Sequence, residues 1–256
     1  MEQSAKSKRL WYFLFFLLII YLLINTGIVS DDISYTLSAK HRHLAENLIP
    51  VRSWFTTPLE NYTHVIWYRF FRLDNLVVNN LVKTAYILLC FYFVSKFFSI
   101  YLSGLNVLFA PFLFIFFPSH DSTIYWFLGQ HLTFSISLYL FAYYKAYHDR
   151  VPLALALAFI ASFVSYGVVA VAFPLSLVFF LDKKVKKALA LFIPSAIYFV
   201  FYIFITKVMS GGVDMIPANP DFYAIAKQFT LQVFTFVDAV FGPSMWLKVY
   251  YAFCQL

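Results

Sequence analysis

Charged residues are scarce in this chain. Only 12% of its 256 residues are Asp, Glu, Lys or Arg, whereas soluble domains carry about 25%. Hydrophobic residues make up 62% of the sequence, and aromatic residues alone make up 22%. This balance excludes an ordinary soluble domain and indicates an integral membrane protein, in which Phe and Tyr suit lipid-facing surfaces and interfacial belts.

Cysteine and cofactor motifs are also scarce. The two cysteines, Cys90 inside an apolar run and Cys254 near the end, are too few for a disulfide framework, and we interpret both as packing residues. The sequence contains no Walker loop, no dinucleotide fingerprint, no paired-cysteine or His-x-x-x-His metal spacing and no nucleophile elbow. These absences argue against chemistry that uses ATP or a nicotinamide.

Long apolar runs are what the sequence does contain. The first covers residues 10–28, and six more follow at 84–102, 105–117, 126–144, 152–164, 168–181 and 188–208. Residues 165–167 break the stretch from 152 to 181 into a tight helical hairpin. We therefore expect an all-α polytopic membrane protein with about seven transmembrane helices, some of them short. Residues 1–208 form this module, and residues 209–256 form an outer loop with a helix that is either interfacial or an eighth span.

The cations predict the orientation of the spans. With a cytoplasmic N-terminus, that side contains Lys6, Lys8, Arg9, Lys145, Arg150, Lys183, Lys184, Lys186 and Lys187. The short outer loops at 118–125 and 165–167 contain no Lys or Arg. The net charge of +7 thus reflects topology and does not indicate nucleic-acid binding. A bacterial inner membrane is favoured, with the endoplasmic reticulum as the alternative.

An acidic pair, Asp31 and Asp32, directly follows the first apolar run and opens a long outer loop of residues 29–83. Two carboxylates are expensive to keep at the mouth of a membrane helix. The same loop is expected to contain interfacial helices near 35–48 and 62–73. Its cations include Lys40, Arg42, His43, Arg69 and Arg72, which are candidates for phosphate binding or for anchoring to lipid headgroups.

A second polar concentration lies in the next outer loop, where His120 and Asp121 precede the span at 126–144. Asp121 is a candidate to orient an acceptor, to complete a divalent metal site, or only to cap the helix that starts near Thr123. His131 lies one turn into that span, where it faces either a cavity or a packed helix interface.

The order of these features resembles the GT-C superfamily of integral-membrane glycosyltransferases. Members share an acidic pair just after the first span, at the start of a long outer loop with interfacial helices. Asp31 and Asp32 occupy that position, and residues 118–131 look like the family's second outer loop and the helix after it. The bend at Ser165 and Tyr166 lacks the polar pair often found there, so no site residue is transferred to it.

The resemblance implies a sugar transferred from a polyprenyl-phosphate carrier, as a hexosyl or pentosyl group, to an extracytoplasmic glycan, lipid or protein. A base must take the acceptor proton, and we expect Asp31 to do so, with Asp32 as the close second candidate. A divalent cation, Mg or Mn, is an open cofactor, with Asp32 and Asp121 as its candidate ligands.

Three alternatives remain open at this point. Asp31 and Asp32 are also suited to cap an interfacial helix. A lipid or small-molecule transporter or flippase is the competing functional class, and it would require ionisable residues within the spans. The chain could also be a non-catalytic subunit of a larger membrane complex with a partner subunit.

Overall fold

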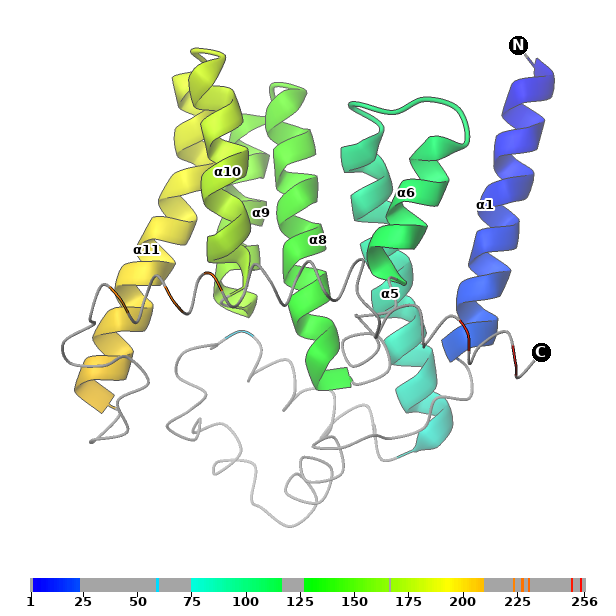
Figure 1. The fold of residues 1–256 in the computed structure, drawn as a ribbon, viewed down its shortest axis with the longest axis horizontal. Coiled ribbons are helices and arrows are strands. Elements are labelled where there is room, and N and C mark those ends of the chain that lie inside the picture. The colour runs from blue at the N-terminus through cyan, green and yellow to red at the C-terminus, as the bar shows by residue number, and fades with distance from the viewer. Residues whose placement is uncertain are drawn as a thin grey trace.

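Seven helices make up the fold of the described residues, which contain no strand (Figure 1). The structure is a computed structural model that describes residues 2–23, 75–116, 127–165 and 167–209, together with the single residues 59, 223, 227, 230, 250 and 254. The helices are α1 (Glu2–Leu23), α5 (Leu76–Phe98), α6 (Asn106–Ile115), α8 (Phe127–Tyr147), α9 (Val151–Val164), α10 (Val168–Leu181) and α11 (Val185–Met209). The all-α fold is therefore confirmed with seven helices in the described residues, two of which are long and apolar enough to span a membrane, and the expected interfacial helices fall outside the described residues.

The helices alternate in direction along the chain, so that the fold has two distinct ends (Figure 1). At one end α1 finishes, at Leu23, and both α5 and α8 begin. We call this the polar end. At the other end lie the connections between α5 and α6, α8 and α9, and α10 and α11. We call this the basic end, because Lys145, Arg150 and Lys183 lie there.

The helix α5 begins eight residues before the expected start at residue 84. Asn75 caps it, since its side-chain oxygen accepts hydrogen bonds from the backbone amides of Val77 (3.0 Å) and Val78 (3.4 Å). The early start draws Lys83 out of the expected loop and into the helix. The expected boundary was wrong because the polar residues of this first part, Lys83 among them, lower the local hydropathy.

Two clusters of buried side chains hold the helices together. The first lies where α1, α5 and α6 meet; its buried members are Phe15, Phe91 and six non-aromatic residues, and the Phe15 ring lies 4.9 Å from that of the partly buried Phe112. The second joins α8, α9, α10 and α11 around Tyr139, Tyr143 and a row of alanines. Phe134 of α8 packs against both clusters. Helix α8 is thus central to the fold, with α5 on one side and the last three helices on the other.

The α9–α10 hairpin confirms the bend expected at residues 165–167. Ala154, Ala158 and Ala161 are fully buried on one face of α9, and such small residues let neighbouring helices approach closely. The bend is packed rather than exposed, because a Cβ at Gly167 would overlap the side chain of Leu132 on α8. A larger residue here would have to displace the Leu132 side chain, so the close approach to α8 favours glycine.

Helix α11 contains Pro194, which removes one backbone donor from its interior. Polar side chains from the neighbouring helices lie beside this position. The Tyr139 hydroxyl donates to the carbonyl oxygen of Leu191 (2.9 Å), and the hydroxyls of Ser162 and Ser195 lie 2.9 Å apart. Interhelical hydrogen bonds of this kind are typical of helices packed in an apolar medium.

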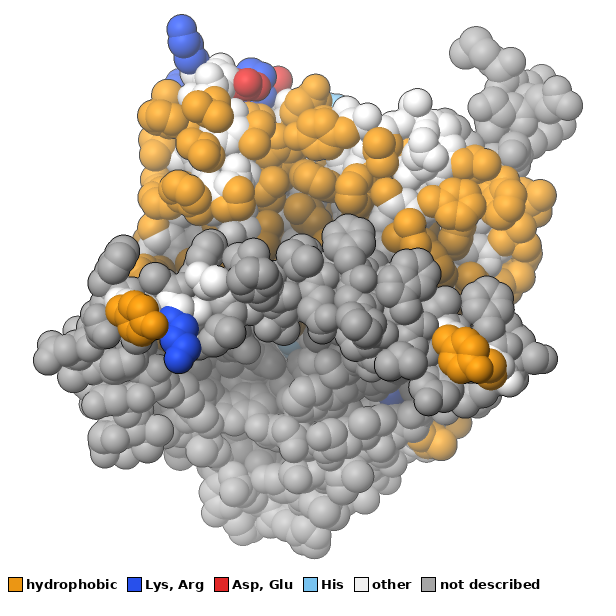
Figure 2. All heavy atoms as spheres, viewed as in Figure 1, with side chains coloured by type: hydrophobic (Ala, Val, Ile, Leu, Met, Phe, Trp, Pro, Cys, Tyr) orange, Lys and Arg blue, Asp and Glu red, His pale blue; other side chains and the backbone are white. Residues whose placement is uncertain are grey.

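The surface of the described helices is largely apolar. Hydrophobic side chains cover the flank shown in Figure 2, and charged side chains gather at the basic end. Helices α5 and α11 contain segments long and apolar enough to cross a membrane, Leu76–Phe98 and Val185–Ile205. By contrast, α9 and α10 have 14 residues each. Each is about 21 Å long, shorter than a bilayer core of roughly 30 Å.

Candidate functional site

The acidic pair and the loop cations that the sequence singles out lie outside the described residues. These are Asp31, Asp32, Lys40, Arg42, His43, Arg69, Arg72, His120 and Asp121. Their proposed roles remain predictions. What the structure does show is the set of helix ends to which these segments connect.

The buried stripe of α5 changes character along the helix. Nearest the polar end it consists of Asn79, Asn80, Lys83 and Thr84, and further along it consists of Ile87, Cys90, Phe91 and Val94. These positions recur at the spacing of one helix face. One continuous face of α5 therefore packs polar side chains at the polar end and almost only apolar ones beyond it.

Helix α8 supplies the other side of the polar stretch. Gln130 and His131 are both buried, with exposed fractions of 0% and 1%. The His131 ring lies 5.5 Å from the ring of Tyr86 on α5, which fixes the two helices relative to one another. Further along, the Phe97 ring lies 5.4 Å from that of Tyr143, so the two helices run side by side in the same direction.

This register sets His131 beside Tyr86, in the same half of the helix pair as the buried polar residues of α5. Since His131 lies level with Tyr86, Lys83 lies less than one turn nearer the polar end, about 5 Å along the helix axis. We call Asn79, Asn80, Lys83, Gln130 and His131 the polar cluster. Each of the five is engaged in an interaction within the folded chain.

Lys83 is the decisive member of the polar cluster. Its side chain is 0% exposed, and a lysine is almost never fully buried unless it is paired. Burying an ammonium group removes its hydration, so the group requires an anion or several hydrogen-bond acceptors close by. A buried ammonium of this kind is suited to hold a carboxylate or a phosphate.

The polar cluster also includes residues level with the end of α1, from which the chain leads to the acidic pair. Helix α1 packs antiparallel to α5, with the Phe15 ring 6.0 Å from the Phe91 ring. Counting along both helices from this contact sets Leu23 level with Lys83. Asp31 follows Leu23 by only eight residues. The first loop therefore leaves α1 at the level of the polar cluster.

No family model, curated protein or solved structure matches this chain. The chemistry of the site therefore has to be argued from the chain's own residues.

Metal ligands are not grouped in the described part of the chain. No cluster of three or more His, Cys, Asp or Glu residues occurs there. The candidate ligands Asp32 and Asp121 lie outside it. A divalent cation thus stays a prediction, which rests on those two residues alone.

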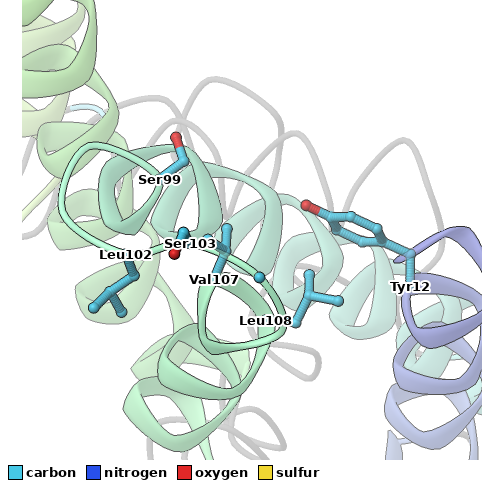
Figure 3. A pocket seen from close by; sticks show the side chains of 7 residues that line it. Tyr12, Ser99, Leu102, Ser103, Val107 and Leu108 are labelled. Atoms are coloured by element: carbon cyan, nitrogen blue, oxygen red, sulfur yellow. The ribbon is translucent and has the colours of Figure 1, made fainter. Parts of the chain in front are cut away.

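A small cavity at the basic end has few polar groups that could bind or activate a substrate. It has a volume of about 280 Å³ and lies between Tyr12 of α1 and the loop from Ser99 to Gly104 (Figure 3). The Ser99 hydroxyl donates to the carbonyl oxygen of Lys96 (2.6 Å), and the remaining lining is mainly apolar. The polar cluster is consequently the better candidate for function.

Sequence reasoning missed most of the polar cluster. Asn79, Asn80 and Lys83 fall within the loop expected at residues 29–83, and hydropathy does not single out Gln130 within the span expected at 126–144. The signal that reveals them is spacing: residues 79, 80, 83, 84, 87, 90, 91 and 94 share one face of a helix. Of the two orientations left open for His131, the structure shows the packed one, between α8 and α5.

Proposed function

We propose that this protein is a membrane glycosyltransferase that takes a sugar from a polyprenyl-phosphate donor on the extracytoplasmic side. The observation that carries the proposal is the full burial of Lys83 near the polar end of α5, at the level where α1 ends and the chain leads on to Asp31 and Asp32. Transfer from a lipid phosphate needs a general base and a positive charge for the leaving phosphate. Asp31 supplies the base, with Asp32 as the alternative, and Lys83 supplies the charge.

The amides and the imidazole of the polar cluster have a matching role. Asn79, Asn80 and Gln130 offer both donors and acceptors, which suit sugar hydroxyls and phosphate oxygens. His131 adds a ring nitrogen against Tyr86. In this arrangement the cluster binds the phosphate end of the donor, while the carboxylate activates the acceptor hydroxyl.

Membrane insertion is part of the same proposal. The two candidate spans, α5 and α11, and the exposed apolar side chains of α1 and α10 support it. With the basic end in the cytoplasm, the polar end faces the periplasm or an organelle lumen, in agreement with the positive-inside rule.

The test is sugar transfer by the purified full chain in nanodiscs, with a panel of polyprenyl-phosphate sugars as donors. Removing a general base typically lowers turnover by 10²–10⁴-fold, so we expect about this loss for Asp31→Asn or Asp32→Asn. Both variants must elute as the wild type does in size-exclusion chromatography. If no donor is turned over by the wild type, or if both variants transfer sugar at the wild-type rate, the proposal is wrong.

A transporter is the second candidate, because Lys83 and His131 are ionisable residues buried between helices. Their depth argues against it. Lys83 lies seven residues into α5, about 10 Å from its first residue, whereas coupling sites of transporters lie near the middle of the bilayer. Uptake or flipping of a labelled lipid by proteoliposomes, lost in Lys83→Met and kept in Asp31→Asn, would favour the transporter.

A further inference from the structure

The turns that follow α8 and α10 at the basic end have the same backbone structure. After α8, the amide of Arg150 donates to the carbonyl oxygen five residues earlier (2.9 Å), and Asp149 has a φ of 62°. After α10, the amide of Lys184 makes the same bond (2.9 Å), and Lys183 has a φ of 59°. This is the Schellman motif, which usually has glycine at the left-handed position. Both turns therefore have a charged side chain at a position where the backbone favours glycine.

An ion pair joins the two turns. The Lys187 ammonium, in the first turn of α11, donates to the Asp149 carboxylate (2.8 Å) and to the carbonyl oxygen of the last residue of α8 (3.2 Å). The Lys187 side chain is only 13% exposed, so it is committed to this contact. The neighbours of the pair, Arg150 and Lys186, thus belong to two turns that are held against each other. We give the name basic patch to the exposed residues Arg150, Lys183 and Lys186.

The positive charge of the basic patch is not balanced by the carboxylates beside it. Asp149 is paired with Lys187, and Asp182 is paired with Lys184 (3.1 Å). Within the described part of the chain, the side chains of the basic patch form no salt bridge and no hydrogen bond. The three cations repel one another, and Lys186 does not complement the dipole of α11 because it lies in the first turn. A bound anion would offset both costs.

Apolar side chains are exposed directly beside the basic patch. Phe180 and Leu181 end α10, and Val185 and Leu189 lie on one face of α11. Charged and apolar side chains are neighbours on this flank of the fold (Figure 2). A soluble anion or an acidic peptide would neutralise the charges and leave the apolar side chains uncovered. A phospholipid with an anionic headgroup covers both, since its chains lie beside its phosphate.

We propose that the basic patch binds the phosphate of an anionic phospholipid from the leaflet that surrounds the basic end. Arg150 offers two parallel hydrogen bonds to phosphate oxygens, and Lys183 and Lys186 supply point charges. The acyl chains lie along Leu181, Val185 and Leu189. The proposal goes beyond sugar transfer and requires only that α10 and α11 lie in a membrane.

The experiment is photolabelling of the full chain in phosphatidylcholine nanodiscs. Two probes are compared, a phosphatidylglycerol and a phosphatidylcholine, each with a diazirine near the headgroup end of one acyl chain, and adducts are mapped by mass spectrometry of peptides. Each Lys or Arg near an anionic headgroup contributes about fivefold in affinity, so we expect at least about tenfold more phosphatidylglycerol than phosphatidylcholine adducts at residues 180–189. Excess unlabelled phosphatidylglycerol should remove these adducts. Equal labelling by the two probes, or removal by inorganic phosphate as effective as removal by phosphatidylglycerol, would overturn a lipid site.

Matched variants test the basic patch itself. Lys186→Gln should lower the ratio of phosphatidylglycerol to phosphatidylcholine adducts by about fivefold. The control is Lys96→Gln, which removes a cation of the same end on α5 and should change the ratio by less than about twofold. Asp182→Asn should raise the ratio, because it frees the charge of Lys184. A structural role of these exposed residues predicts no such rise.

The labelling ratio and sugar transfer fail independently. An equal loss in Lys186→Gln and Lys96→Gln would show that the charge of the whole end, and not the basic patch, attracts the lipid, and would overturn the proposal. A wild type that shows the expected ratio but transfers no sugar would uphold the basic patch and overturn the transferase.

Discussion

The two ends of the α5–α8 pair place lysines in opposite environments. At the basic end, Lys96 and Lys145 are half-buried at the rim, with the ammonium nitrogens 5.4 Å from the Tyr92 ring and 4.6 Å from the Phe141 ring. At the polar end, Lys83 is fully enclosed between helices. A rim lysine keeps its charge in water while its stem covers apolar surface, whereas an enclosed lysine is retained despite the cost of desolvation.

The side chains around these lysines also differ between the two ends. Rings fill the space between the helices at the basic end, where Phe93 and Phe141 stack at 4.7 Å. At the polar end the His131 ring lies 5.5 Å from the Tyr86 ring, and the buried stripe of α5 contains Asn79, Asn80 and Lys83. Aromatic packing stabilises an interface without any ligand, but a buried group of ionisable and amide side chains is costly unless it serves a purpose. We therefore expect the basic end of this pair to be structural and its polar end to contain the functional residues.

The largest difference in activity is expected when the same substitution is made at both ends of α5. We expect Lys83→Met to lower sugar transfer by about 10²-fold or more, because the charge that holds the leaving phosphate is lost. Lys96→Met should change it by less than about twofold, within the range of surface changes. Turnover is measured on both proteins in nanodiscs at matched concentration.

Lys83→Arg separates chemistry from folding in this experiment. It keeps the positive charge, so partial activity in Lys83→Arg and none in Lys83→Met indicates an electrostatic role. Equal turnover in Lys83→Met and Lys96→Met would show that the polar cluster is only structural.

The second test concerns the contact between Gly167 and Leu132, which joins the bend between α9 and α10 to α8 near His131. Gly167→Val places side-chain atoms where the Leu132 side chain lies, next to His131. Overpacking of this kind typically costs 1–3 kcal/mol, and we expect about 2 kcal/mol in the free energy of unfolding. Reversible unfolding in detergent measures it. Leu132→Ala combined with Gly167→Val should restore most of the loss, and a double variant as unstable as Gly167→Val would contradict the contact.

How far the sequence predicts this fold depends on which kind of signal each helix carries. The bounds of α9 and α10 follow from hydropathy within one residue, since every residue of those helices except the serines and Pro152 and Pro174 is apolar and a glycine marks the bend. The start of α5 does not follow from hydropathy. A window that averages over residues cannot separate a polar loop from a helix whose buried face is polar.

The candidate site is accordingly the part that is hardest to read from sequence. The polar cluster is defined by two helices whose register is set by ring contacts 45 residues apart, Tyr86 with His131. Local composition contains no information about that register. Asp31 and Asp32 are conspicuous in the sequence because they are adjacent, whereas Lys83 becomes conspicuous only when its burial is known.

A smaller effect on stability is expected from removing the hydrogen bond between Tyr101 and Tyr143 at the basic end. The hydroxyls of Tyr101 and Tyr143 lie 2.6 Å apart, between the loop after α5 and helix α8. Interhelical hydrogen bonds in membranes average about 0.6 kcal/mol, so Tyr143→Phe should lower the free energy of unfolding by about this amount. Tyr101→Phe and the double variant should cost the same, because all three lack the same bond. Sugar transfer should be unchanged, and additive costs would show that the two hydroxyls act separately.

The smallest expected effect is a pH dependence at the basic end. The Lys187 ammonium donates to a carboxylate oxygen of Asp149 (2.8 Å), and this bond and charge hold the pKa of Asp149 below its ordinary value of 3.8. A carboxyl whose pKa is depressed by folding contributes stability above its unfolded pKa, and that contribution disappears as the pH falls through the folded value. The wild type should therefore lose this increment below about pH 4.

Asp149→Asn keeps a residue that tolerates the positive φ of 62° and removes the carboxylate, so its unfolding midpoint should lack that part of the acid dependence. Because Asp149 is fully exposed, the difference between the two acid profiles should be small and should shrink further in high salt. Superimposable profiles at low salt would show that the ion pair at the basic end contributes nothing to stability, and the contrast between the two ends would then rest on the aromatic contacts alone.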